Sequence, residues 1–124
     1  MPDVRRALGK LGEDMAAHHL QRLGYVILER NYRCRQGEVD IIARDGERLV
    51  FVEVRARRGT AFGTPKESIT ARKQARLVTV ARRYLQEHDY SEVDWGIDVV
   101  ALQFTSRGVL QRLEVIRNAV MEMG

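Results

Sequence analysis

The sequence predicts a layered α/β domain of the α+β type, in which helices flank a mixed β-sheet. Three observations lead to this fold class. Apolar residues near the N-terminus recur with a helical period, two strand-like runs in residues 37–57 flank an Asp-Gly pair, and a second helical segment precedes two further strands. The order of helix, three strands, helix and two strands is typical of layer folds. A length of 124 residues fits one domain, which we expect to span residues 1–124.

The first helix is predicted from about Val4 to Leu23. Gly12 lies on its apolar arc, where the missing side chain would permit close packing, and Gly24 is a natural residue to end the helix. Glu13 lies at the far edge of the arc and could reach the sheet, although an exposed position is the simpler alternative. The residues that share the arc are Val4, Leu8, Leu11, Met15, His19 and Leu23.

The first three strands are predicted at Tyr25 to Arg33, Glu38 to Arg44 and Arg48 to Arg57. The second and third form a hairpin, because Asp45-Gly46 between them is a strong signal for a two-residue turn.

The hairpin register decides which side chains share a face of the sheet. With Asp45-Gly46 as the turn, Asp40 opposes Phe51 and Glu38 opposes Glu53. Asp40 and Glu53 are then diagonal neighbours on one face, which Arg55 shares. A slip of one residue would separate the two acids. The opposite face, directed into the core, holds Val50, Val52 and Val54.

The second half of the chain supplies one helix and two strands. Thr64-Pro65-Lys66-Glu67 combines a capping-box pattern with proline at the first helical position, so a helix should follow to about His88. Strands are predicted at Trp95 to Phe104 and at Val109 to Arg117, with a turn between them at residues 106–108.

Two carboxylates as close as Asp40 and Glu53 repel each other unless a positive charge lies between them. A divalent metal is the natural occupant, and carboxylate oxygens favour Mg²⁺ or Mn²⁺. Lys73 points along the inward face of the second helix, where it either meets this acidic site or extends past the edge of the core. The simpler alternative is a solvated hairpin face on which acids and arginines pair across strands.

Composition points weakly to a phosphate-rich partner. The net charge is +4, and 18 of the 21 basic residues are arginine, many of them clustered around residues 55–58 and 72–83. Such clusters fit a nucleic acid, although they also occur on ordinary solvated surfaces. The lone Cys34 excludes an internal disulfide and a zinc site built on paired cysteines, so a reducing cytoplasm is the expected location. We find no signal peptide, membrane span, P-loop or dinucleotide fingerprint.

An acid on the first helix, then Asp40, then Glu53-Val54-Arg55 resembles the PD-(D/E)XK nuclease signature. In that superfamily a restriction endonuclease-like αβββαβ core holds an Asp and a Glu on adjacent strands, with a lysine two residues beyond the second acid. The predicted element order is this core with one additional C-terminal strand. The chain is most similar to the YraN-like family, which is related to Holliday junction resolvases, and the resemblance extends through Asp98. The segments that carry it are GKLGEDMAAHHLQRLGYVILERNYR, GEVDIIARDG, VFVEVRAR and FGTPKESI.

The resemblance implies metal-binding roles for Asp40 and Glu53, with Glu13 as an accessory acid and Mg²⁺ or Mn²⁺ as the cofactor. Lys73 lies in the helix where related nucleases place an auxiliary polar or basic residue. Arg55 departs from the pattern. Arginine is always protonated and cannot act as a general base, but it can bind a phosphate with two parallel hydrogen bonds.

We therefore expect a metal-dependent endonuclease that hydrolyses phosphodiesters in DNA, with branched or structured DNA as the suggested substrate. Its catalytic residues would be Asp40, Glu53, Arg55 and Lys73, and its DNA backbone contacts would be Arg57, Arg58, Arg72 and Arg76. A homodimer would supply the two active sites that cleavage of a four-way junction requires. The alternative is a catalytically weak or inactive nucleic-acid-binding protein on the same fold. A protein-interaction module is a third alternative.

Overall fold

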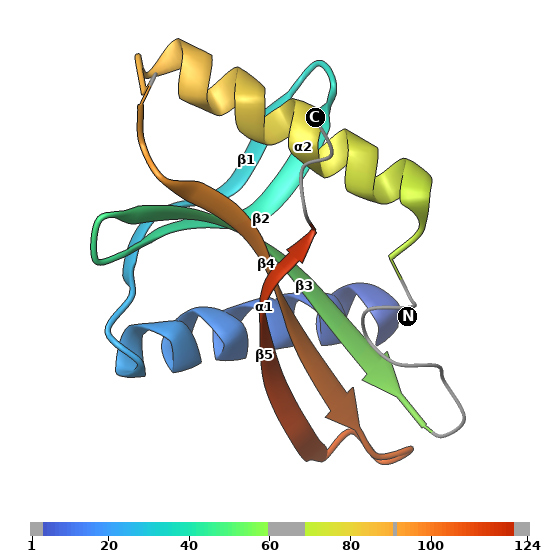
Figure 1. The fold of residues 1–124 in the computed structure, drawn as a ribbon. Coiled ribbons are helices and arrows are strands. Elements are labelled where there is room, and N and C mark those ends of the chain that lie inside the picture. Colours follow the sequence, from blue (N-terminus) through green and yellow to red (C-terminus); the bar gives the residue numbers. More distant parts are fainter. Residues whose placement is uncertain (1–3, 60–68, 91, 121–124) are drawn as a thin grey trace.

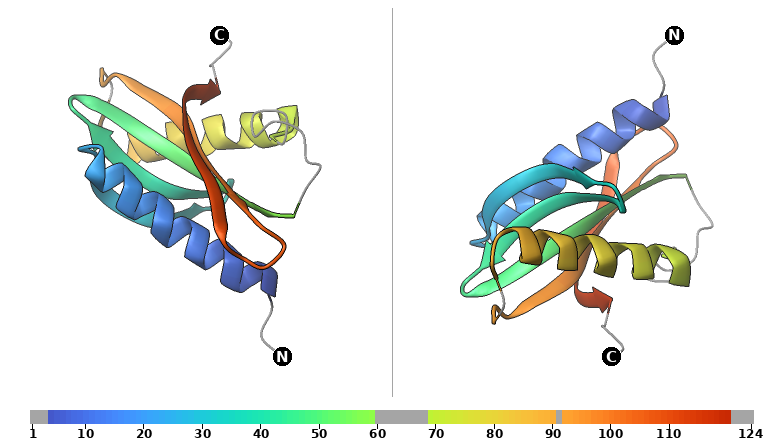
Figure 2. Two further views of the ribbon diagram at one scale, coloured as in Figure 1. Left: turned by 90° about the horizontal axis from the view of Figure 1, so that it is seen from below. Right: turned by 90° about the horizontal axis from the view of Figure 1, so that it is seen from above.

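The computed structural model describes residues 4–59, 69–90 and 92–120, which form two helices and a five-stranded mixed sheet of the α+β class (Figure 1). The helices cover opposite faces of the sheet (Figure 2), so each face has its own apolar core. In chain order the elements are α1 (Val4–Arg22), β1 (Val26–Cys34), β2 (Gly37–Asp45), β3 (Arg48–Arg58), α2 (Ala71–Glu87), β4 (Trp95–Phe104) and β5 (Leu110–Val120).

The strands lie in the sheet in their chain order, from β1 at one edge to β5 at the other. Only β3 and β4 are parallel, because α2 carries the chain back across the sheet between them. The remaining neighbours are antiparallel. The predicted element order is therefore confirmed, and the predicted bounds of β4 agree with the structure.

The sheet divides between β2 and β3. Their paired residues end at Ile41 and Val52, although β2 begins four residues earlier and β3 continues to Arg58. Beyond this point β2 pairs only with β1, whereas β3 pairs with β4 along its whole length from Leu49. We call this division the fork. It separates a β1–β2 half from a β3–β4–β5 half.

The hairpin turn differs from the prediction by one position. Asp45 pairs with Arg48, so the two central residues are Gly46 and Glu47. Of these only Gly46 has a positive φ, at 64°, as in a type II′ turn with glycine first. The predicted turn would have placed Asp45 in that left-handed conformation. The register moves by two residues, so every side chain keeps its predicted face of the sheet.

Helix α1 is rotated relative to the predicted arc. Its buried residues are small, with Gly12, Ala16 and Ala17 beside Leu20, whereas Leu11 is 46% exposed. The small residues allow the helix backbone to approach the sheet closely. This close approach gives more van der Waals contact than packing through the larger side chains of the predicted arc would give. The rotation also brings Glu13 toward the sheet.

Gly12→Ala is predicted to destabilise the protein by about 1–3 kcal/mol. A Cβ atom at Gly12 would lie 2.9 Å from the Cβ of Ala56 on β3, so the helix would have to move away from the sheet. Gly9→Ala on the same helix is the control, because nothing lies within 4 Å of its Cβ position. That change should stabilise the protein by about 0.5–1 kcal/mol. Urea denaturation measures both, and equal effects of the two changes would contradict the close packing.

Helix α2 begins at Ala71, later than the capping box predicted. Thr70 is the N-cap and its side chain accepts a hydrogen bond from the backbone N–H of Lys73. The predicted capping box at residues 64–67 lies outside the described residues. The buried face of α2 packs Leu77, Val80 and Tyr84 against the sheet.

A buried polar cluster joins the β3–β4–β5 half at the end opposite the β3 C-terminus. The carboxylate of Asp98 on β4 is fully buried and accepts a hydrogen bond from Arg48 (2.8 Å) and from the backbone N–H of Asn118 (2.9 Å). The hydroxyl of Tyr25 donates to the same carboxylate at 3.4 Å. One carboxylate therefore ties β3, β4 and β5 to the residue that precedes β1.

Candidate active site

Asp40 lies where the sheet divides. Its Oδ2 accepts the backbone N–H of Val54 at 2.8 Å, so a side chain replaces the strand-to-strand bond just where the pairing of β2 and β3 ends. Burial, followed by the neighbouring carboxyl of Glu53, raises the pKa of Asp40 to about 8. The structure thus brings together the two acids that the sequence placed on one face.

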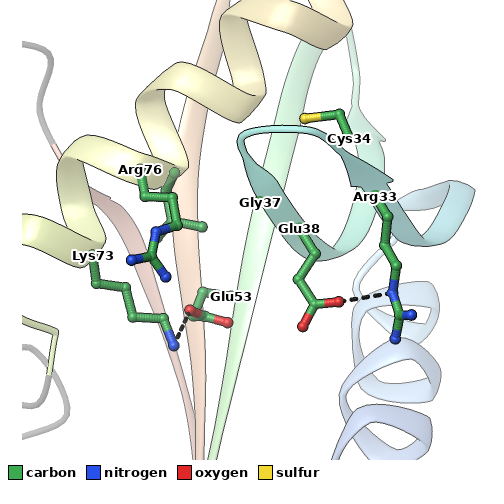
Figure 3. A pocket seen from close by; sticks show the side chains of 8 residues that line it. Arg33, Cys34, Gly37, Glu38, Glu53, Lys73 and Arg76 are labelled. Carbon is green, nitrogen blue, oxygen red and sulfur yellow. Dashed lines mark hydrogen bonds and ion pairs between the residues drawn. The ribbon is translucent and has the colours of Figure 1, made fainter.

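Glu53 follows the last β2–β3 pair on β3 and is only 6% exposed. Its Oε2 lies 2.9 Å from Nζ of Lys73 on α2 (Figure 3). This contact is an ion pair, but no described group donates a well-directed hydrogen bond to that oxygen. Lys73 therefore neutralises the acid electrostatically and leaves Oε2 able to accept a further bond. The inward position predicted for Lys73 is confirmed.

Glu13 comes from α1 and is held by β1. Arg30 donates two hydrogen bonds to its Oε1, at 2.9 and 3.1 Å, and the side-chain amide of Asn31 donates a third at 3.0 Å. The charge of Glu13 still reaches Asp40, because it contributes to the raised pKa of that carboxyl. Glu13 is thus near enough for its charge to act on Asp40, while its Oε1 accepts hydrogen bonds from β1.

Arg55 lies two residues beyond Glu53 on β3. Its Nε is buried and has no hydrogen-bond partner among the described residues. A buried, unpartnered guanidinium nitrogen is costly unless another group binds it. This position is compatible with a phosphate ligand, and Arg55 does not line the pocket described below.

The four arginines predicted to contact DNA have different surroundings. Arg58 donates to the carbonyl oxygen of Ser106 at 2.6 and 2.9 Å, so it secures the β4–β5 turn. Arg57 also has a partner. Arg72 and Arg76 are exposed on α2, and of these two only Arg76 lines the pocket beside Glu53.

A pocket of about 480 Å³ opens between α2 and the paired ends of β1 and β2 (Figure 3). Glu53 and Lys73 lie on one side of it, and an ion pair between Arg33 and Glu38 lies on the other. The residues that line it are Arg33, Cys34, Gly37, Glu38, Glu53, Lys73, Arg76 and Leu77. The pocket is a direct result of the fork, because β2 has left β3 where it forms.

The donor atoms fit a hard divalent cation held by two carboxylates. Within residues 4–59, 69–90 and 92–120, no group of three or more His, Cys, Asp or Glu side chains is placed to hold a metal. Mg²⁺ commonly uses one or two carboxylates and completes its shell with waters and substrate phosphates. Asp40 and Glu53 meet that requirement, and burial together with the neighbouring Glu53 carboxyl raises the pKa of Asp40.

Sequence reasoning missed the roles of Arg30, Arg33 and Gly37. The chain has 18 arginines. No local sequence pattern distinguishes Arg30 and Arg33, which bind acids on neighbouring elements, from the others. Gly37 precedes Glu38 in the predicted strand, but its role in the pocket depends on α2, which is distant in sequence.

Residues 12–102 match the model of an uncharacterised protein family, UPF0102. The chain belongs to the UPF0102 family. UPF0102 proteins of Pelotomaculum thermopropionicum and Desulforamulus reducens are 46% and 45% identical to it, and these alignments cover 96% and 94% of this chain and 99% and 97% of theirs. A UPF0102 protein of Acidothermus cellulolyticus is 58% identical over 73% of this chain and 69% of its own.

Membership in UPF0102 confirms the predicted YraN-like family and gives no activity, because the relatives carry only the family name. Neither described helix combines the length and the apolar character needed to cross a bilayer.

Proposed function

We propose that this UPF0102 protein is a metal-dependent endonuclease that hydrolyses phosphodiester bonds in DNA. The observation that carries the proposal is the convergence at the fork of Asp40 and Glu53, with Lys73 2.9 Å from the second acid. The αβββαβ order, with β5 added, supports kinship with restriction endonuclease-like proteins. Cytoplasmic location fits this function, since both DNA and Mg²⁺ are present there.

Each residue of the site would have a separate role. Asp40 and Glu53 would hold Mg²⁺ or Mn²⁺, which on binding supplies a lowered pKa for coordinated water and charge for the phosphoryl oxygens. Arg55, whose buried Nε has no hydrogen-bond partner among the described residues, would bind the phosphate under attack. Lys73 would exchange its bond to Glu53 for one to a phosphate oxygen. Arg57, Arg72 and Arg76 would contact the DNA backbone, whereas Arg58 is committed to Ser106.

A cleavage assay with matched variants tests the proposal. Labelled linear duplex, flap and four-way junction DNA are incubated with protein in Mg²⁺, Mn²⁺ or EDTA. Asp40→Asn and Glu53→Gln should each lower the cleavage rate at least about 100-fold, since each removes a charge that the reaction requires. Glu114→Gln on β5, which removes a half-exposed acid paired with Arg112, is the control. Cleavage that survives both site variants unchanged would refute the proposal.

A second candidate function is nucleic-acid binding with little or no cleavage, and Arg55 in place of lysine favours it. Arginine cannot accept a proton from water. Salt-dependent DNA binding without cleavage in either metal would support this candidate over the nuclease. It would be supported further if Arg55→Lys also gained no cleavage.

A further inference from the structure

The pocket beside Glu53 has more positive than negative side chains. Arg33 is paired with Glu38 and Lys73 with Glu53, which leaves Arg76 as the cation without a partner among the described residues. A pocket with one uncompensated guanidinium attracts an anion. In Figure 3 the head of Arg76 points toward Lys73 and Glu53, so an anion bound by Arg76 would also approach the proposed active site.

The stem of Arg76 passes close to a glycine on β2. A Cβ atom at Gly37 would lie 3.0 Å from Cδ and 3.1 Å from Cγ of Arg76, so only glycine lets the stem cross this strand without displacement. Gly37 also has a φ of 150°, which other residues rarely adopt. Gly37 thus leaves room for the stem of an arginine whose head group has no partner among the described residues.

Part of the pocket lining is apolar or without a side chain. Leu77 is buried, Cys34 is half-buried, and Gly37 has no side chain. The volume of about 480 Å³ lies within the range of small-molecule sites. Guanidinium planes such as those of Arg33 and Arg76 stack on unpaired bases.

We propose that this pocket binds one unpaired nucleotide of the DNA strand, with its phosphate at Arg76 and Lys73 and its base against Leu77 and Cys34. The inference rests on the proposed function for the identity of the polymer and deepens it by stating the substrate class. A base stacked in a duplex cannot enter a pocket of this size. The substrate therefore carries an unpaired nucleotide beside the cleaved phosphate, as flaps and single strands do.

Cys34 allows a test that does not depend on cleavage. It is the chain's single cysteine and it lines the pocket, so the rate of its alkylation by iodoacetamide reports occupancy. The measurement is made in EDTA with 2′-deoxyadenosine 5′-monophosphate, and separately with 2′-deoxyadenosine and with inorganic phosphate. The backbone amide resonances of Cys34 and Gly37 follow the same titrations without requiring thiol reactivity.

The nucleotide should slow alkylation and shift both resonances at concentrations where the nucleoside and phosphate have little effect. Arg76→Met should weaken the nucleotide about tenfold, as expected for the loss of one charge-assisted contact. Arg82→Met is the matched control, because Arg82 is exposed on the same helix and does not line the pocket.

Three results would overturn the inference. These are protection by phosphate alone equal to that by the nucleotide, equal weakening by Arg76→Met and Arg82→Met, and the absence of both protection and resonance shifts. Failure of the nuclease proposal gives a different pattern, in which the nucleotide protects Cys34 normally and the DNA is not cleaved.

Discussion

Asp98→Ala is expected to lower the free energy of unfolding by about 3–5 kcal/mol, because it leaves a partly buried cation without its counter-charge. Asp98 is fully buried and accepts hydrogen bonds from Arg48 and from the backbone of Asn118. Without this carboxylate, the Arg48 guanidinium and a backbone N–H lose their acceptor in the core. Urea denaturation at neutral pH measures the loss.

Asp45→Ala is the matched control for Asp98→Ala. Asp45 also forms an ion pair with an arginine, Arg117, at 3.2 Å, but both side chains are substantially exposed. Exposed pairs of this kind contribute less than about 1 kcal/mol. If the two variants lost equal stability, the Asp98 cluster would not be the structural centre that its burial indicates.

Asp40→Asn is expected to make the metal-free protein more stable than wild type at pH 9, and this difference should shrink as the pH falls toward 3.8. The pKa of Asp40 is raised from 3.8 to about 8 by burial and by Glu53. Between those values the folded protein binds a proton that the unfolded chain has released, so the contribution of Asp40 to stability falls as the pH rises. It is fully present below pH 3.8 and is lost once the pH passes about 8.

Asparagine resembles the protonated acid and does not ionise, so the two proteins should diverge with pH. At pH 9 the variant should be more stable by at least about 1.4 kcal/mol, the equivalent of one pKa unit. Urea denaturation in EDTA at pH 5, 7 and 9 gives the difference. Asp14→Asn is the control, because the hydrogen bond from the neighbouring Arg30 lowers the pKa of that exposed carboxyl. A constant difference between wild type and Asp40→Asn across this range would contradict the carboxyl pair.

Local sequence signals predicted the elements well and the long-range contacts poorly. The alternation of apolar residues placed β4 correctly and assigned the faces of the hairpin, because strand geometry has a period of two whatever surrounds it. The turn was misplaced, since Asp-Gly also fits the register in which only glycine takes the left-handed conformation. The arc of α1 was misjudged because side-chain size, rather than hydrophobicity, decides how closely a helix approaches a sheet.

The sequence predicted that the two acids of the candidate site lie on one face of the sheet, but it did not predict the residues that surround them. Asp40 and Glu53 follow from alternation within one hairpin, and the inward side of Lys73 follows from helical period. The bond from Arg30 to Glu13 and the packing of Arg76 over Gly37 join elements that are distant along the chain. No local period encodes such contacts, because they depend on where the sheet divides.

The fork makes the spacing of the two carboxylates a property of the whole fold. Asp40 belongs to the β1–β2 half and Glu53 to the β3–β4–β5 half, so the gap between their oxygens widens or narrows with the angle between the halves. Consecutive residues of α1 bridge that angle, since Gly12 packs on β3 and Glu13 is bonded to β1. Ions differ in the ligand distance they require, about 2.0–2.1 Å for Mg²⁺ and 2.3–2.6 Å for Ca²⁺. In the proposed metal site, ion preference can therefore evolve through substitutions beneath α1 that leave both acids unchanged.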